Sequence, residues 1–135
     1  MNKNLDEILC PIGEGYHWYK AFVELKPILG KAAWLFNFEE AQMAPAVGGG
    51  FIYLVLAGPS IREVIDRVED VARKENVELV DIISVQRVED LSDLPTDEET
   101  ETLDPAISEC IDAGFNADSV AFSVIYLYPE NKDQI

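Results

Sequence analysis

The sequence has one histidine, two cysteines and no lysine or arginine between Val88 and Asn131, and each shortage excludes a class of function. Imidazole is the side chain that ordinarily titrates near neutral pH, so acid–base chemistry of that kind would have to use His17. No serine, cysteine or carboxylate stands at a spacing that would complete a catalytic motif with His17, and Cys10 has no local signature of a nucleophile. The sequence therefore predicts no catalytic residue.

The two cysteines, Cys10 and Cys110, also lack the paired spacing of metal ligands. Two reduced thiols are the favoured interpretation, with a disulfide as the alternative. The acidic run from Asp93 to Asp104 has enough carboxylates for calcium, but as a twelve-residue loop it puts Pro95 at the third position and Glu98 where the sharp turn needs glycine. We expect no metal and no cofactor.

Long uncharged apolar runs are missing as well, so the sequence predicts neither a membrane span nor a signal peptide, and we expect a cytoplasmic protein. What is present is the composition of a folded domain: 48% of the 135 residues are hydrophobic. We expect a single α+β domain over residues 1–135, with a lead-in arm at 1–15 and an acidic loop at 89–104.

The net charge of −16 is unevenly distributed. Residues 1–87 hold 13 acidic and 9 basic residues, whereas residues 88–131 hold 12 acidic residues and no basic one. Such a surface repels nucleic acid and anionic lipid, so neither is expected as a partner. The charge instead predicts a basic protein partner, bound by these residues: Glu89, Asp90, Asp93, Asp97, Glu98, Glu99, Glu101 and Asp104.

Hydrophobic periodicity predicts strands at residues 16–26, 51–57, 77–88 and 119–128, and a short helical turn at Leu5–Leu9. We expect residues 77–88 to form an interior strand beside 51–57. The two strands of such a β-helix-β unit are normally parallel and in the same sheet, though not necessarily adjacent. Ser60 and Glu63 form a capping box that opens a helix ending at Asn76. Asp104 and Pro105 open a second, brief helix that Gly114 closes.

Residues 34–38 are ambiguous, because Trp34, Phe36 and Phe38 alternate as in a strand while the spacing from Lys31 to Met43 also fits a helix. With the strand included, the elements predict a two-layer sandwich of ferredoxin-like type. Its four- to five-stranded, mostly antiparallel sheet would carry both helices on one face. The other face would then expose aromatics such as Phe22 and Trp34 or Phe36, through which two copies could form a homodimer.

Two functions fit these features. The first is a non-catalytic protein-binding domain, in its sharpest form an immunity or inhibitor protein whose carboxylates cover the cationic cleft of a nuclease toxin. The alternative is a small-ligand regulatory domain, or an enzyme with an unrecognised site. That alternative needs polar groups converging among apolar walls, and these residues would supply them: His17, Tyr53, Tyr126 and Tyr128.

Overall fold

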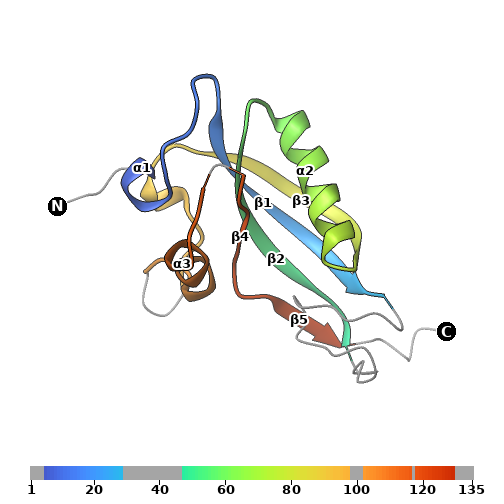
Figure 1. Cartoon of the computed structure of the whole chain (residues 1–135). Coiled ribbons are helices and arrows are strands. Elements are labelled where there is room, and N and C mark those ends of the chain that lie inside the picture. Colours follow the sequence, from blue (N-terminus) through green and yellow to red (C-terminus); the bar gives the residue numbers. More distant parts are fainter. Residues whose placement is uncertain (1–4, 29–46, 98–101, 117, 130–135) are drawn as a thin grey trace.

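A computed structural model describes residues 5–28, 47–97, 102–116 and 118–129 of the chain, and these form one antiparallel sheet with helices on both sides (Figure 1). Strands follow the order β3-β1-β2-β4, and β5 also pairs with β2. This confirms the predicted α+β class with a mostly antiparallel sheet. The elements, in chain order, are α1 (Leu5–Ile8), β1 (His17–Pro27), β2 (Val47–Gly58), α2 (Ile61–Lys74), β3 (Val77–Val88), the 3-10 turn η2 (Leu91–Asp93), α3 (Pro105–Asp112), β4 (Ala121–Phe122) and β5 (Tyr126–Pro129).

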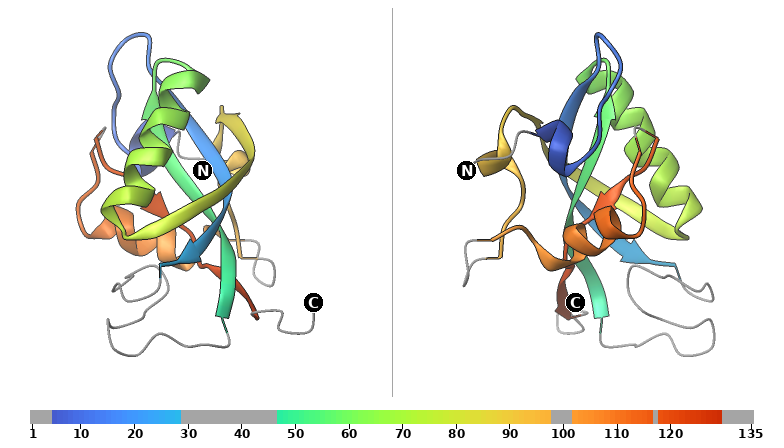
Figure 2. Two further views of the ribbon diagram at one scale, coloured as in Figure 1. Left: turned by 90° about the vertical axis from the view of Figure 1, so that its right-hand side faces the viewer. Right: turned by 60° about the vertical axis from the view of Figure 1, so that its left-hand side comes forward.

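Helix α2 covers the first face of the sheet, as the left view of Figure 2 shows. Its buried stripe of Val64, Val68 and Ala72 packs on alternate residues of β1 and β2, including Val23 and Leu54. Full burial of a valine or leucine side chain contributes about 1.5–3 kcal/mol, so this layer is the main core. The Ser60 hydroxyl accepts from the Glu63 amide, which is the serine half of the predicted capping box, and the left-handed residue Asn76 (φ 58°) follows the helix as predicted.

A second core lies on the opposite face. Trp18 and Val55 point away from α2 and pack with Leu94, just after η2, and Ile107 of α3, while the Trp18 indole stacks on Phe115 at 5.5 Å. The helices α2 and α3 therefore cover opposite faces, whereas the sequence predicted both on one. The position of the last residue of β3 explains this difference. Val88 pairs with Trp18 on the second face, so the leucines that follow Val88 in the chain pack on that face.

Among the described strands, β3 lies at the edge of the sheet and pairs with β1 alone, whereas the sequence predicted an interior strand. It runs antiparallel to β1, as β2 does, so β2 and β3 are parallel, as predicted, but β1 separates them. Two register shifts against β1 accompany the exposed side chains of Val80 and Ile83, which are 39% and 47% exposed. Such bulges twist an edge and hinder its pairing with another chain.

The predicted strand at residues 119–128 is broken into β4 and β5. At the break, the Tyr53 amide donates to the Ser123 hydroxyl at 2.9 Å. The hydroxyl oxygen thus takes the place of a backbone carbonyl oxygen in the hydrogen-bond ladder. The next amide, Val124 N–H, leaves the ladder and donates to the Asp104 carboxylate at 3.2 Å. Side chains have therefore replaced two ladder groups, which the alternating pattern did not reveal.

The predicted strand at residues 34–38 lies outside the described residues. Among those that the structure describes, no helix has the length and apolar character needed to cross a membrane.

Candidate binding surface

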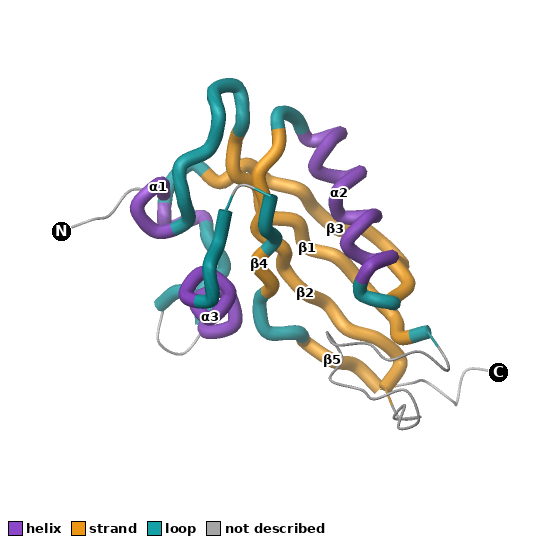
Figure 3. The backbone as a smooth tube through the Cα atoms, viewed as in Figure 1, coloured by secondary structure: helices purple, strands orange, loops and turns teal. Residues whose placement is uncertain are grey.

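The charge asymmetry of the sequence is also an asymmetry in space. We call residues 89–97 and 102–116, which include η2 and α3, the acidic layer; they contain no lysine or arginine. Helix α2, by contrast, has four basic and four acidic residues. In Figure 3 α3 lies at the lower left of the strands and α2 over their upper right, in agreement with their two separate cores. One side of the molecule is thus acidic, and the other is mixed.

Three of the predicted partner-binding acids bond within the chain. Asp90 caps η2 by accepting from the Ser92 amide at 2.8 Å. Hydrogen bonds from the backbone amides of Glu89 and Asp90, in that order, hold the pKa of Asp93 below its usual value. Asp104 is only 2% exposed, so its carboxylate belongs to the core.

Exposed carboxylates remain in the acidic layer beside these internal ones. Glu89 is exposed, as are Glu109 and Asp112 on the outer side of α3. Glu109 and Asp112 were not among the predicted partner-binding residues, although their helical spacing from buried Ile107 and half-buried Ile111 places them outward. Asp97 is half-buried, and the three remaining predicted residues, Glu98, Glu99 and Glu101, lie outside the described residues.

Among the described residues, the helices and turns that cover the second face of the sheet lie at one end of it. Beyond Val55, four rings from β1, β2 and β5 form a continuous surface that we call the aromatic stripe: Phe22, Phe51, Tyr53 and Tyr128. The ring centroids of Phe22 and Tyr53 are 4.5 Å apart, those of Phe22 and Phe51 5.8 Å, and those of Phe51 and Tyr128 5.5 Å. The three angles between ring planes are 20–45°, so the rings form a gently curved surface rather than a cage.

A hydrogen bond ties this stripe to a carboxylate. The Tyr128 hydroxyl donates to Glu24 Oε2 at 2.5 Å. Burial, together with this bond and the negative charge of Glu24, raises the pKa of Tyr128 to about 12. Tyr128 can approach because β2 has Gly49 at this point, where a Cβ would collide with the tyrosine ring.

The structure gathers three of the four residues of the predicted ligand pocket. Tyr53 and Tyr128 belong to the aromatic stripe, and Tyr126 is the cross-strand partner of Phe51. His17 stands apart, because it lies at the far end of β1 and faces the α2 side, with its ring edge-on to Tyr19 at 6.5 Å. The tyrosines therefore belong to an open sheet face that does not include the histidine.

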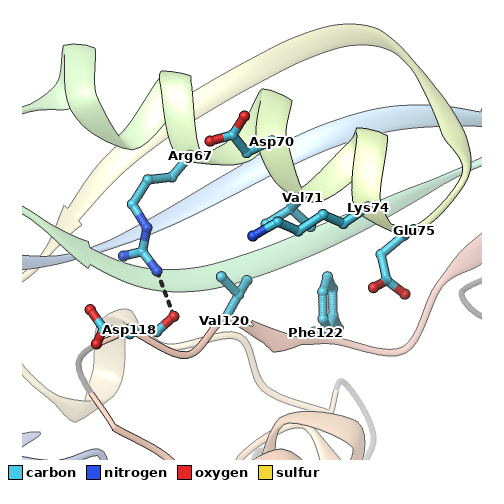
Figure 4. A pocket seen from close by; sticks show the side chains of 8 residues that line it. All are labelled: Arg67, Asp70, Val71, Lys74, Glu75, Asp118, Val120 and Phe122. Carbon is cyan, nitrogen blue, oxygen red and sulfur yellow. Dashed lines mark hydrogen bonds between the residues drawn. The ribbon is translucent and has the colours of Figure 1, made fainter.

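A groove of about 270 Å³ lies between α2 and the segment that leads into β4 (Figure 4). Arg67 donates to the carbonyl oxygens of Ala57 and Asp118, the second at 2.9 Å, and so fastens α2 to both neighbours. Lys74 extends along the groove, whose lining also includes three acidic residues. The arginine is occupied structurally, and the mixed charge favours no particular ligand.

Within the residues that the structure describes, no three histidine, cysteine, aspartate or glutamate side chains are grouped closely enough to hold a metal ion. Comparisons with family models, with curated proteins and with solved structures found no match for this chain. The assignment of function therefore depends on the surfaces described above.

Proposed function

We propose that the protein is a non-catalytic binding domain whose acidic layer engages a basic protein. The observation that carries this proposal is the separation of charge across the sheet, with an acidic layer on one side and a balanced helix α2 on the other. Charge complementarity of this kind speeds diffusional encounter and rejects partners of the wrong charge.

The two surfaces of the second face supply different parts of an interface. Exposed carboxylates such as Glu89, Glu109 and Asp112 steer association, but each contributes little affinity on its own because water and salt screen it. Aromatic side chains are enriched among the residues that dominate interface energies, and the aromatic stripe lies beside the acidic layer on the same face. A partner that spans both would meet steering charge and apolar area together.

An immunity or inhibitor role is the narrower form of this proposal. The partner would be an enzyme with a cationic substrate cleft, such as a nuclease toxin, and the carboxylates would lie where substrate phosphates otherwise bind. The alternative, a small-ligand domain, has less support because His17 lies apart from the tyrosines that were to share its pocket.

The test begins with capture of partners from native cell lysate at low salt, followed by calorimetric titration of the purified partner. Two variants of equal charge and matched chemistry are compared. The first removes charge from the acidic layer (Glu89→Gln, Glu109→Gln, Asp112→Asn), and the second removes it from the exposed side of α2 (Glu63→Gln, Glu69→Gln, Asp66→Asn).

We expect the first variant to bind the purified partner about tenfold more weakly, because three rim charges of several tenths of a kcal/mol each are lost. The second variant should bind as the wild type does. Equal weakening by both variants would mean that only net charge matters, and would contradict a defined acidic interface. Binding unchanged in both, at low as well as at moderate salt, would remove the acidic layer from the interface altogether.

A further inference from the structure

The half of the second face that no described helix covers has a particular pattern of side chains. In the sheet register, Glu24 of β1 lies directly between Asp81 of β3 and Phe51 of β2. One row of the ladder therefore presents two carboxylates and then an aromatic ring, all on the face that α2 does not cover. The neighbouring row presents Phe22 opposite Tyr53.

The two carboxylates oppose one another, and no described cationic side chain pairs with either of them. Like charges directly opposite each other on adjacent strands are destabilising, and the only hydrogen bond of the pair within the described chain is the one Glu24 accepts from Tyr128. Asp81 is exposed, and neither carboxylate forms an ion pair with any described lysine or arginine. A cation supplied from outside would relieve this repulsion.

The adjacent rings favour a cation of a particular shape. The ammonium group of Lys20 already lies 5.9 Å from the centre of the Tyr53 ring, so this face attracts positive charge. A guanidinium is planar, sheds its hydration more readily than an ammonium, stacks on aromatic rings and donates two parallel bonds to carboxylates. Arginine therefore fits the combination of flat rings and paired carboxylates better than lysine does.

We propose that this half of the face docks an arginine side chain of the basic partner, with its guanidinium between Glu24 and Asp81 and its flat side on the aromatic stripe. The inference rests on the proposed function, because it assumes a basic partner. Beyond that function, it identifies arginine as the residue type that is recognised, and it adds the aromatic stripe as a contact site besides the acidic layer. A second copy of this chain is a poorer occupant, because two molecules of net charge −16 repel one another.

The experiment uses two synthetic probes of equal charge, hexa-arginine and hexa-lysine peptides, titrated into the ¹⁵N-labelled full chain. We expect the arginine peptide to bind several-fold more tightly, and to shift the amide signals of Phe22, Glu24 and Phe51 more than those of α2. In the double variant Glu24→Gln with Asp81→Asn, affinity for the arginine peptide should fall about tenfold, because charge-assisted hydrogen bonds are lost. The variant Phe22→Leu should lower the preference for arginine while keeping the face apolar.

The acidic-layer variant separates this inference from the proposed function. It should weaken both peptides alike and leave the preference for arginine intact, since it removes only screened, long-range charge. If both peptides bind equally and the shifts map to α3 alone, the arginine site is refuted while the acidic layer survives. If neither peptide binds, both ideas fail. A dimer in sedimentation equilibrium that Phe22→Leu dissociates would show that a second copy covers the stripe, and would overturn the inference.

Discussion

The buried carboxylate of Asp104 offers the sharpest test of how the acidic layer is held together. One oxygen, Oδ1, accepts from the amides of Ala106 at 2.9 Å and Ile107 at 3.2 Å, and so caps α3. The same carboxylate accepts from the Val124 amide, on the segment that joins β4 to β5. Asp104 thus joins the first turn of α3 to the edge of the sheet.

The variant Asp104→Ala removes all of these bonds at once. Loss of the cap costs about 0.5–2 kcal/mol, and an amide left without its acceptor costs about 1–3 kcal/mol if it is shielded from water. Because Val124 is partly exposed, the lower half of the second range applies, and we expect the free energy of unfolding to fall by about 2–4 kcal/mol. Asp104→Asn keeps a capping oxygen and should lose only about 1 kcal/mol.

Urea unfolding followed by tryptophan fluorescence measures both changes, because Trp18 packs in the same core as α3. The control is Asp112→Ala, an exposed aspartate at the other end of the same helix, which should change stability by less than about 0.5 kcal/mol. If Asp104→Ala costs no more than Asp112→Ala, Asp104 is not the link between the helix and the sheet, and the reasoning is wrong.

Two further predictions concern the aromatic stripe. Gly49→Ala should destabilise the fold by about 1–3 kcal/mol in urea, since the new Cβ would lie 2.6 Å from the Leu25 carbonyl oxygen and would collide with Tyr128. Gly13→Ala, whose nearest neighbouring atom is 3.9 Å away, is the control, and equal effects at the two glycines would contradict the close approach. The pKa of Tyr128 is raised to about 12 in the folded state, so the wild type should lose stability as pH rises from about 10 to 12. In thermal unfolding over that range Tyr128→Phe should show a shallower loss, and identical slopes would contradict the raised pKa of Tyr128 and the buried, bonded position from which it follows.

The parts of the fold that were predictable from sequence are those set by local chemistry. Ser60 opening α2, the left-handed Asn76 after it, and Asp104 with Pro105 opening α3 are all present in the structure. Each depends on a side chain and amides within a few residues, so a short window of sequence contains the whole interaction.

The wrong predictions concern pairings between distant residues. The edge position of β3 and the covering of the second face by α3 follow from the contact of Val88 with Trp18, seventy positions apart. The hydrophobicity of β3 did not distinguish an interior strand from a bulged edge strand. For the same reason the aromatic stripe was only partly predicted: Phe22 was placed on the face away from a helix, but its neighbours come from β2 and β5.

For the acidic surface, the sequence predicted where the carboxylates lie along the chain, but not which of them are occupied by backbone amides. The predicted set included Asp104, although its position before Pro105 already indicated a capping role that consumes the carboxylate. Counting acids overestimates a binding surface whenever some of them satisfy backbone amides. Glu109 and Asp112, which make the outer side of α3 acidic, are better candidates than the capping residues.

The open half of the second face is where this chain departs most from the local rules of a stable sheet. Two carboxylates oppose one another, a buried glycine stands in the strand beside them, and aromatic rings are left partly exposed. Each feature costs stability in the isolated molecule. The first face, under α2, also has a buried glycine, Gly58, and a half-buried ring, Phe122, but its described residues include no pair of opposed carboxylates. Departures of this kind are expected at functional sites. Side chains that form their contacts with a partner leave unfavourable features in the isolated molecule. Their coincidence on one half of one face therefore supports the aromatic stripe, together with Glu24 and Asp81, as the part of the surface that a partner completes.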